Sequence, residues 1–259
     1  MRVDQLGEGT PEVAVVAGVH GDEPCGVRAV EDLLANPPEV RRPVKFVVAN
    51  EAAIDREMRY VQADLNRSFP GDADGETHEA RLAAEITEEL EGCATLSLHS
   101  TRSYADPFAV VSGVDDLVRR VVPALSVDAV VDAASFVEGR LFASGGVVEV
   151  ECGLQGSDEA AENARELIGA FLAAMDALDA PVERESTPLF RLTRPLPKSA
   201  GDEYEVYVDN FRRVEAGETY AAADDERLVA SDPFYPVLLS AYGYTDLFGY
   251  AADRIGTVP

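Results

Sequence analysis

The chain of 259 residues carries 48 acidic and 22 basic side chains, and its net charge of −26 is spread along the sequence, as in haloarchaeal-type proteins that stay soluble at high salt. This charge argues against nucleic acid as a partner, because the phosphates would be repelled. No apolar run approaches the roughly 20 residues of a membrane span and the N-terminus lacks a signal-peptide core, so we expect a cytoplasmic protein with no membrane partner.

Strand-like and helix-like segments alternate along the first 180 residues. The strand-like segments are apolar runs near 12–18, 43–49, 94–99, 107–112, 127–131 and 145–151. The helix-like segments repeat apolar residues at helical spacing near 25–35, 79–91, 114–122 and 157–179. This alternation predicts an α/β layered domain with a mainly parallel or mixed sheet.

After residues 179–182, the alternation of strand-like and helix-like segments ends. Short strand candidates follow at 189–192, 205–208 and 236–239, separated by Pro, Gly and Asp. We therefore predict a catalytic domain over residues 1–182 and a small β-rich C-terminal domain over residues 183–259.

Two of the three histidines lie where apolar strands end. His20 and Glu23 follow the strand near 12–18, and His99 ends the strand near 94–99. Open α/β sheets place their sites at the carboxyl ends of strands. Two His and one carboxylate form a common catalytic zinc set, with the fourth position open for water. The pattern indicates a zinc hydrolase, whereas His78 opens a helix and is interpreted as a solvated residue.

Arginines and carboxylates elsewhere in the sequence could serve such a site. The loop over 59–71 gathers Arg59, Asn66 and Arg67 among turn residues, and a guanidinium binds a carboxylate bidentately or polarises a carbonyl. Glu149 and Glu151 alternate along a strand and face the same side. A buried carboxylate is costly unless it is paired or functional, and a metal hydrolase needs one that takes a proton from water.

Several of these segments together resemble the succinylglutamate desuccinylase/aspartoacylase family. Residues 18–23 resemble its G-x-H-G-[ND]-E motif, residues 50–53 its N-x-x-A motif, and residues 59–67 its R-Y-x-x-x-D-L-N-R block. Residues 151–153 resemble its E-x-G motif. The resemblance implies a three-layer zinc-carboxypeptidase-like domain with a mixed, twisted sheet, joined to the small β-rich domain.

The resemblance also implies roles in metal binding and catalysis. His20, Glu23 and His99 would hold one Zn²⁺ per subunit. Glu151 would act as general base and then as general acid, and Arg59 would polarise the scissile carbonyl and hold the oxyanion. The expected reaction is hydrolysis of a linear amide by promoted water.

Four further residues are implied to bind the substrate, a small N-acyl amino acid. Asn66 and Arg67 would grip its α-carboxylate, Arg140 would bind the carboxylate of the acyl group, and Tyr244 would close the pocket. A homo-oligomer is compatible with the sequence.

Three alternatives stay open at this point. Aspartoacylases usually have Asp two residues before the third ligand, whereas this chain has Ser97, which looks more like a carboxypeptidase strand. A metallocarboxypeptidase that cuts peptides is therefore the nearest alternative. The others are an amidohydrolase for a modified amine or diamino compound, and a non-catalytic zinc-binding module.

Overall fold

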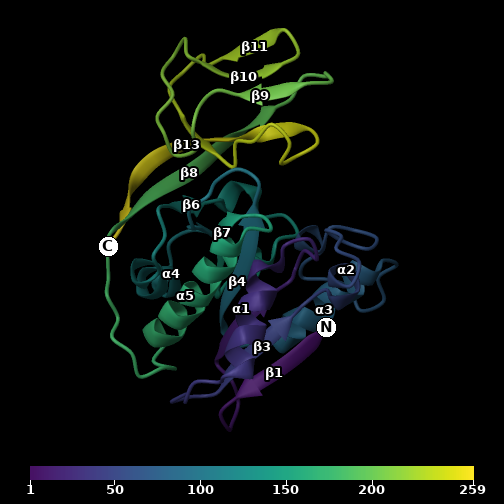
Figure 1. Ribbon diagram of the computed structural model, residues 1–259, viewed down its shortest axis with the longest axis vertical. Helices are drawn as coiled ribbons and strands as arrows, with labels where there is room; N and C mark the ends of the chain where they lie inside the picture. Colours follow the sequence, from purple (N-terminus) through teal and green to yellow (C-terminus); the bar gives the residue numbers. More distant parts are fainter.

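A computed structural model describes residues 1–259 (Figure 1). Its main feature is a ten-stranded sheet in the order β1-β3-β2-β4-β7-β5-β6-β8-β13-β12. Strands β2, β3, β4 and β7 are mutually parallel neighbours, whereas β1 pairs antiparallel with β3 and β5 pairs antiparallel with β7. The strands of the first 182 residues are β1 Arg2–Leu6, β2 Val13–Ala17, β3 Val44–Val48, β4 Ala94–Thr101, β5 Phe108–Val111, β6 Val130–Asp132 and β7 Val147–Leu154.

Helices cover both faces of this sheet and make it a three-layer structure. Alternate residues of β2 enter two different cores, because successive side chains of a strand point to opposite faces. Val13 and Val15 pack with the buried residues of α1, α4 and α5, and Ala14 and Val16 pack with those of α3. The α-helices are α1 Pro24–Ala35, α2 Glu51–Ile54, α3 His78–Glu89, α4 Asp116–Val121 and α5 Asp158–Ala174. The predicted mixed α/β class is confirmed.

Helix α5 shows how the sequence sets these elements. The hydroxyl of Ser157 accepts a hydrogen bond from the backbone N–H of Ala160 and caps the first turn. The apolar positions that recur along the helix are all buried against the sheet and α1. Short 3-10 turns connect other elements at η1 Leu65–Arg67, η2 Val122–Ala124, η3 Ala134–Phe136 and η4 Leu141–Ser144. None of the helices is both long and apolar enough to cross a membrane.

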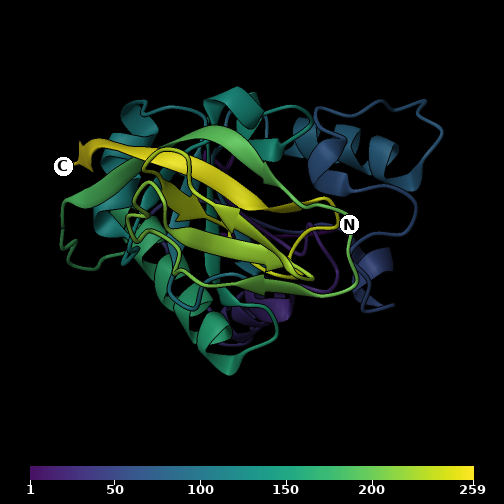
Figure 2. The same ribbon diagram turned by 90° about the horizontal axis from the view of Figure 1, so that it is seen from above.

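The C-terminal part is rich in strands and lies over one end of the molecule (Figures 1 and 2). Three of its strands continue the main sheet, since β8 pairs with β6, and β13 joins β8 to β12. The other three form a separate antiparallel sheet, and a small apolar cluster joins this sheet to β8 and β13. These strands are β8 Thr187–Pro197, β9 Tyr204–Val206, β10 Thr219–Ala223, β11 Glu226–Val229, β12 Tyr235–Val237 and β13 Leu247–Val258.

Candidate active site

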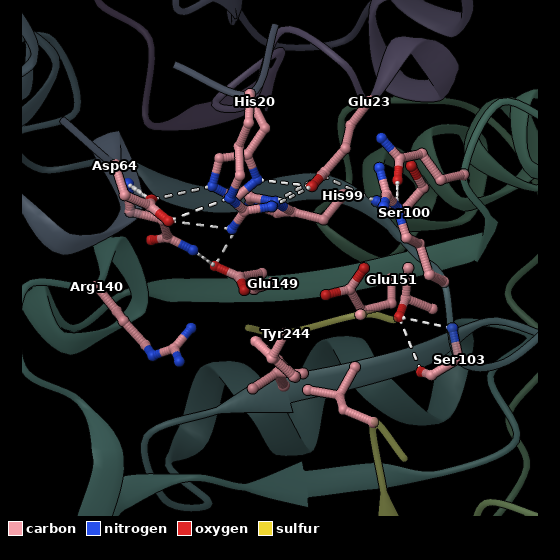
Figure 3. A pocket seen from close by; sticks show the side chains of 18 of the residues that line it. His20, Glu23, Asp64, His99, Ser100, Ser103, Arg140, Glu149, Glu151 and Tyr244 are labelled. Atoms are coloured by element: carbon pink, nitrogen blue, oxygen red, sulfur yellow. Dashed lines mark hydrogen bonds and ion pairs between the residues drawn. The ribbon is translucent and has the colours of Figure 1, made fainter. Parts of the chain in front are cut away.

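His20, Glu23 and His99 meet at the carboxyl ends of β2 and β4 (Figure 3). The Nδ1 atom of His20 lies 2.7 Å from one oxygen of Glu23, and the Nδ1 atom of His99 lies 3.1 Å from the other. All three side chains are at most 5% exposed, and one ligand atom from each lies within 4.8 Å of the others. This arrangement suits a single divalent cation bound by two imidazoles and a carboxylate.

Tight backbone packing holds His20 and Glu23 in place. A Cβ atom at Gly21 would lie 2.2 Å from the carbonyl carbon of Ala53, so only glycine fits there. Asn50 brings the short helix α2 to this position, because its backbone N–H donates to Gly18 and its side chain accepts from the N–H of Ala53. The N-x-x-A segment therefore supports the turn that carries the candidate ligands.

The electrostatics of the cluster fit a bound cation. Burial raises the pKa of Glu23, but the two imidazoles outweigh it and hold that pKa well below its usual range. For His99, burial acts in the opposite direction and lowers the pKa, but Glu149 and Glu23 outweigh it and raise the pKa to about 10. The carboxylates around the imidazoles thus create surroundings that favour positive charge, which a divalent cation would supply.

Glu151 lies beside this cluster in a cavity of about 480 Å³. It is the neighbour of His99 across the parallel β4–β7 pair. Its Oε2 atom and the hydroxyl of Ser100 are buried without a hydrogen-bond partner. Burial and the nearby carboxylates of Glu23 and Glu149 raise the pKa of Glu151 to about 8. An unpartnered carboxylate with a raised pKa is well suited to exchange a proton with a ligand in the cavity.

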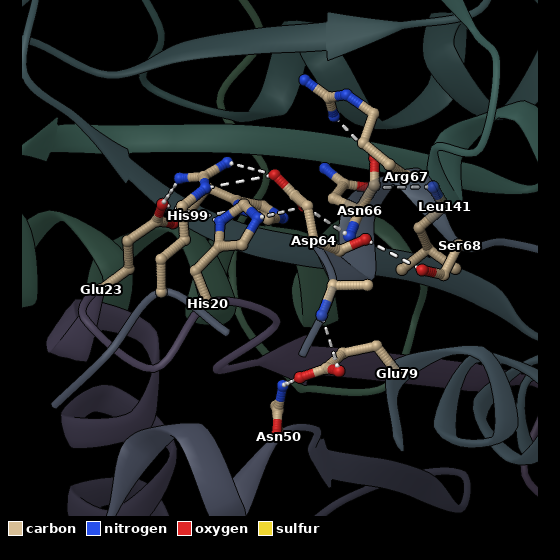
Figure 4. Close-up of polar contacts among 12 residues, drawn as sticks. His20, Glu23, Asn50, Asp64, Asn66, Arg67, Ser68, Glu79, His99 and Leu141 are labelled. Carbon is tan, nitrogen blue, oxygen red and sulfur yellow. Dashed lines mark hydrogen bonds and ion pairs between the residues drawn. The ribbon is translucent and has the colours of Figure 1, made fainter. Parts of the chain in front are cut away.

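Arg59 is held at the edge of the cluster by the carboxylates of Glu23 and Asp64, both labelled in Figure 4. Its Nη1 atom donates to Glu23 at 3.2 Å, and its Nε atom donates to Asp64 at 3.2 Å. Asp64 also contacts the Nε2 atom of His20 at 3.2 Å and accepts from the backbone N–H of Asn66. A guanidinium is thereby fixed beside the candidate metal ligands with part of its surface open to the cavity.

Asn66, Arg67, Arg140 and Tyr244 line the same cavity, so all nine residues singled out from the sequence come together. Asn66 donates from Nδ2 to Glu149 at 3.1 Å and accepts from the N–H of Leu141 at 3.0 Å. Arg67 donates only to the backbone carbonyl of Asn66, and Arg140 only to that of Phe136. Neither guanidinium has an acidic partner, although the chain carries 26 more acidic than basic side chains.

Tyr244 reaches the cavity from the C-terminal part of the chain, on the loop between β12 and β13. Burial and the neighbouring Tyr250 raise its pKa. Lys198 fixes this loop, since its Nζ atom donates to the carbonyls of Ala241 at 2.7 Å and Tyr244 at 2.6 Å. The ammonium also lies 4.6 Å from the ring centre of Tyr204. The loop is thus pinned to the segment that directly follows β8, where Lys198 lies.

Glu79 also supports the site, although it is not among the residues singled out from the sequence. Its carboxylate is fully buried and accepts from the backbone N–H groups of Val61, Gln62 and Ala63 at 2.7–3.1 Å and from the side chain of Asn50 at 3.3 Å. It therefore fixes the loop that carries Arg59 and Asn66. The one available sequence signal for this role is that Glu79 lies on the apolar side of an amphipathic helix, where a charged residue is unexpected.

Replacing Glu79 with Ala is expected to lower the free energy of unfolding by about 2–3 kcal/mol, because hydrogen bonds to a buried charge are lost. Urea unfolding of the metal-free protein measures this. The control is Glu85→Ala, the same exchange at an exposed position of α3. Equal midpoints for the two variants would contradict the assigned role.

The interpretation of His78 as a solvated residue needs correction. His78 is half-buried, and its Nε2 atom is buried without a partner. The reason is local packing, since its backbone N–H is bound by the side chain of Gln62 in the neighbouring loop. It does not line the cavity.

Comparison with known proteins gives the class first. The structure resembles the product-bound ectoine utilization protein EutE (DoeB) from Ruegeria pomeroyi with a TM-score of 0.79 at 19% identity, over 99% of this chain and 88% of that one. It resembles murine aminoacylase 3 with a TM-score of 0.73 at 22% identity, over 97% and 99%. The chain therefore has the fold of the aspartoacylases and succinylglutamate desuccinylases.

Sequence comparison then points to the particular family. Residues 9–123 match the succinylglutamate desuccinylase/aspartoacylase catalytic domain, which supports membership of that family. An N-acyl-aromatic-L-amino acid amidohydrolase (carboxylate-forming) of Xenopus laevis is 34% identical over 87 residues, 30% of this chain and 28% of that protein. Aspartoacylase of Mus musculus is 38% identical over 82 residues, 30% and 24% of the two chains. The aligned part spans less than a third of these two relatives.

Proposed function

We propose that this protein is a zinc-dependent amidohydrolase that cleaves the linear amide bond of a small N-acyl amino acid. The observation that carries the proposal is the single cavity that joins the His20, Glu23 and His99 cluster to the unpartnered carboxylate of Glu151. The relatives named as amidohydrolase and aspartoacylase support the same chemistry.

His20, Glu23 and His99 would hold one Zn²⁺ per subunit. When bound, the ion would lower the pKa of a water molecule and polarise the scissile carbonyl. The donor set fits this ion because the Nδ1 atoms of both imidazoles face the carboxylate of Glu23. The Nε2 atoms, on the far side of each ring, contact other polar side chains that fix the orientation of the rings.

In the proposed reaction, Glu151 transfers the proton and Arg59 stabilises the negative charge. Glu151 takes a proton from the attacking water and returns it to the leaving nitrogen, so that a free amino acid and a carboxylic acid are formed. Arg59 donates to the carbonyl oxygen as negative charge develops there, and its ion pairs with Glu23 and Asp64 keep it in place during the reaction.

The two arginines without acidic partners bind the carboxylates of the substrate. Arg67, with the remaining N–H of Asn66, receives the α-carboxylate, and Arg140 receives a carboxylate of the acyl group. Tyr244 closes this end of the cavity. We propose further that the enzyme works in the cytoplasm with a haloarchaeal-type surface, so that its assays need high salt.

The first test is amine release at high salt from N-acyl amino acids and from short peptides, before and after removal of metal with a chelator. Release from N-acyl amino acids that stops on chelation and returns with Zn²⁺ is expected. Release from peptides alone would replace the proposal by a metallocarboxypeptidase. Zinc binding without hydrolysis of any member of the panel would replace it by a binding module.

Replacing Arg67 or Arg140 with Met is expected to raise KM for the best substrate at least about tenfold, because one charged hydrogen-bonding contact to a carboxylate is lost. Steady-state kinetics at several substrate concentrations separates KM from kcat. Arg119→Met, at an exposed arginine of α4 without an ion pair, is the control. A KM unchanged in both cavity variants would show that the carboxylates bind elsewhere.

A further inference from the structure

Glu149 is a second buried carboxylate beside the candidate metal centre, and the mechanism above gives it no role. It lies on β7 opposite Ser97 of β4, two positions before Glu151. Its side chain is about 4% exposed. The Oε2 atom accepts from Nδ2 of Asn66 at 3.1 Å and lies 3.5 Å from Nε2 of His99 (Figure 3).

The two imidazoles of the cluster are arranged alike. Both turn Nδ1 toward Glu23, and both therefore turn Nε2 away from the ligand atoms. Behind His20, the Nε2 atom meets the carboxylate of Asp64 at 3.2 Å. Behind His99, it meets the hydroxyl of Ser97 at 3.2 Å and the carboxylate of Glu149 at 3.5 Å. Glu149 is thus the carboxylate behind one histidine, as Asp64 is behind the other.

A carboxylate in this position decides which nitrogen of a neutral imidazole carries the proton. It holds the proton on Nε2 and leaves the lone pair of Nδ1 for the metal, and it fixes the orientation of the ring. The same oxygen of Glu149 also anchors Asn66, whose other end is held by Leu141. One side chain therefore connects the metal-binding histidine to the loop that carries Asn66.

We propose that Glu149 is a positioning residue that orients His99 for metal binding and couples this histidine to Asn66. The inference rests on the proposed function for the role of Asn66 and of the metal. Glu149 differs from the general base, because its Oε2 atom is already engaged by Asn66 and His99, whereas Oε2 of Glu151 has no partner.

The test is the zinc affinity of Glu149→Met, measured by competition with a chromophoric chelator. Methionine has a similar length and provides no strong acceptor for either neighbour. Zinc binding is expected to weaken about 10–100-fold, as is typical when a carboxylate behind a ligating histidine is lost. Glu149→Gln keeps an acceptor without the charge, so it should fold even where Met does not, and its loss of affinity should be smaller. Glu166→Gln, at an exposed position of α5, is the control.

A rescue variant separates positioning from a general structural defect. Ser97 already reaches Nε2 of His99, so Ser97→Asp can supply a carboxylate to the same proton. Adding it to Glu149→Met should restore most of the zinc affinity. Glu149→Met should also raise KM for the N-acyl amino acid, because Asn66 loses its anchor, and Ser97→Asp should leave this rise uncorrected. Circular dichroism checks that each variant is folded.

The outcomes distinguish this inference from the proposed function. Wild-type zinc affinity in folded Glu149→Met and Glu149→Gln would overturn the orientation of His99. An unchanged KM in both would overturn the coupling to Asn66. A loss of zinc affinity that Ser97→Asp restores would support the inference even where the wild-type protein hydrolyses no N-acyl amino acid, a result that would refute only the proposed function.

Discussion

Glu151→Gln is expected to lower kcat for amide hydrolysis by about 10²–10⁴-fold, the usual contribution of a positioned proton-transfer group. Glutamine keeps the shape of the side chain but cannot take a proton from water. Because Glu151 does not belong to the metal-binding cluster, zinc content should stay at one ion per chain. The measurement is steady-state amine release together with the metal content of the same sample.

A second property of the same variant checks the environment of Glu151. Its pKa in the metal-free protein is about 8, above the ordinary value of 4.5. As pH rises from 4.5 toward 8, the unfolded chain releases this proton before the folded chain does, so the folded state loses stability. Glu151→Gln removes this loss, and its unfolding free energy in the presence of a chelator should fall less between pH 5 and 8. Parallel pH profiles would contradict the buried position of the carboxyl group.

His99→Ala is expected to abolish zinc binding at micromolar metal, because only one imidazole and one carboxylate remain. The metal-free protein should also lose about 3–5 kcal/mol of stability at neutral pH, since Glu23 and Glu149 lose the cation between them. Metal analysis after dialysis and urea unfolding with a chelator measure the two effects.

His78→Ala is the matched control, because this histidine lies outside the cavity. The sign of the pH dependence provides a further check. The pKa of His99 is raised, so its stabilising contribution is complete below about pH 6.5 and declines as pH rises toward 10. Retention of zinc by His99→Ala would place the metal elsewhere and refute the assignment of this cluster as the metal site.

The sequence predicts the central strands well because their side chains face two cores and read as continuous apolar runs. It does not indicate β1, whose residues alternate between half-buried and exposed and include Arg2 and Asp4. Strand β13 is also missed, since Gly249, Asp253 and Gly256 interrupt its pattern. The continuation of the sheet through β6 and β8 depends on pairing between distant segments, which no local pattern reveals.

The candidate site is predictable where short motifs carry the chemistry and unpredictable where tertiary packing decides. His20, Glu23 and His99 follow from strand ends and from a resemblance in sequence. A period of two does not choose between Glu149 and Glu151, because both face the cavity. The resemblance to the E-x-G motif selects Glu151, and the hydrogen bond that Glu149 accepts from Asn66 agrees with that choice. Glu79 was invisible because the amide groups that it binds belong to another part of the chain.

Under the proposed function, the loop that carries Tyr244 is a place where substrate preference can change independently of catalysis. The proposed metal ligands and catalytic residues all lie within the first 151 residues, whereas Lys198, outside the pocket, holds this wall in place. Insertions or exchanges between β12 and β13 can therefore reshape the wall without moving a metal ligand. A library of variants confined to residues 238–246 would therefore test new substrates while the proposed catalytic residues stay unchanged. Lys198 would be kept, because it holds the loop in place.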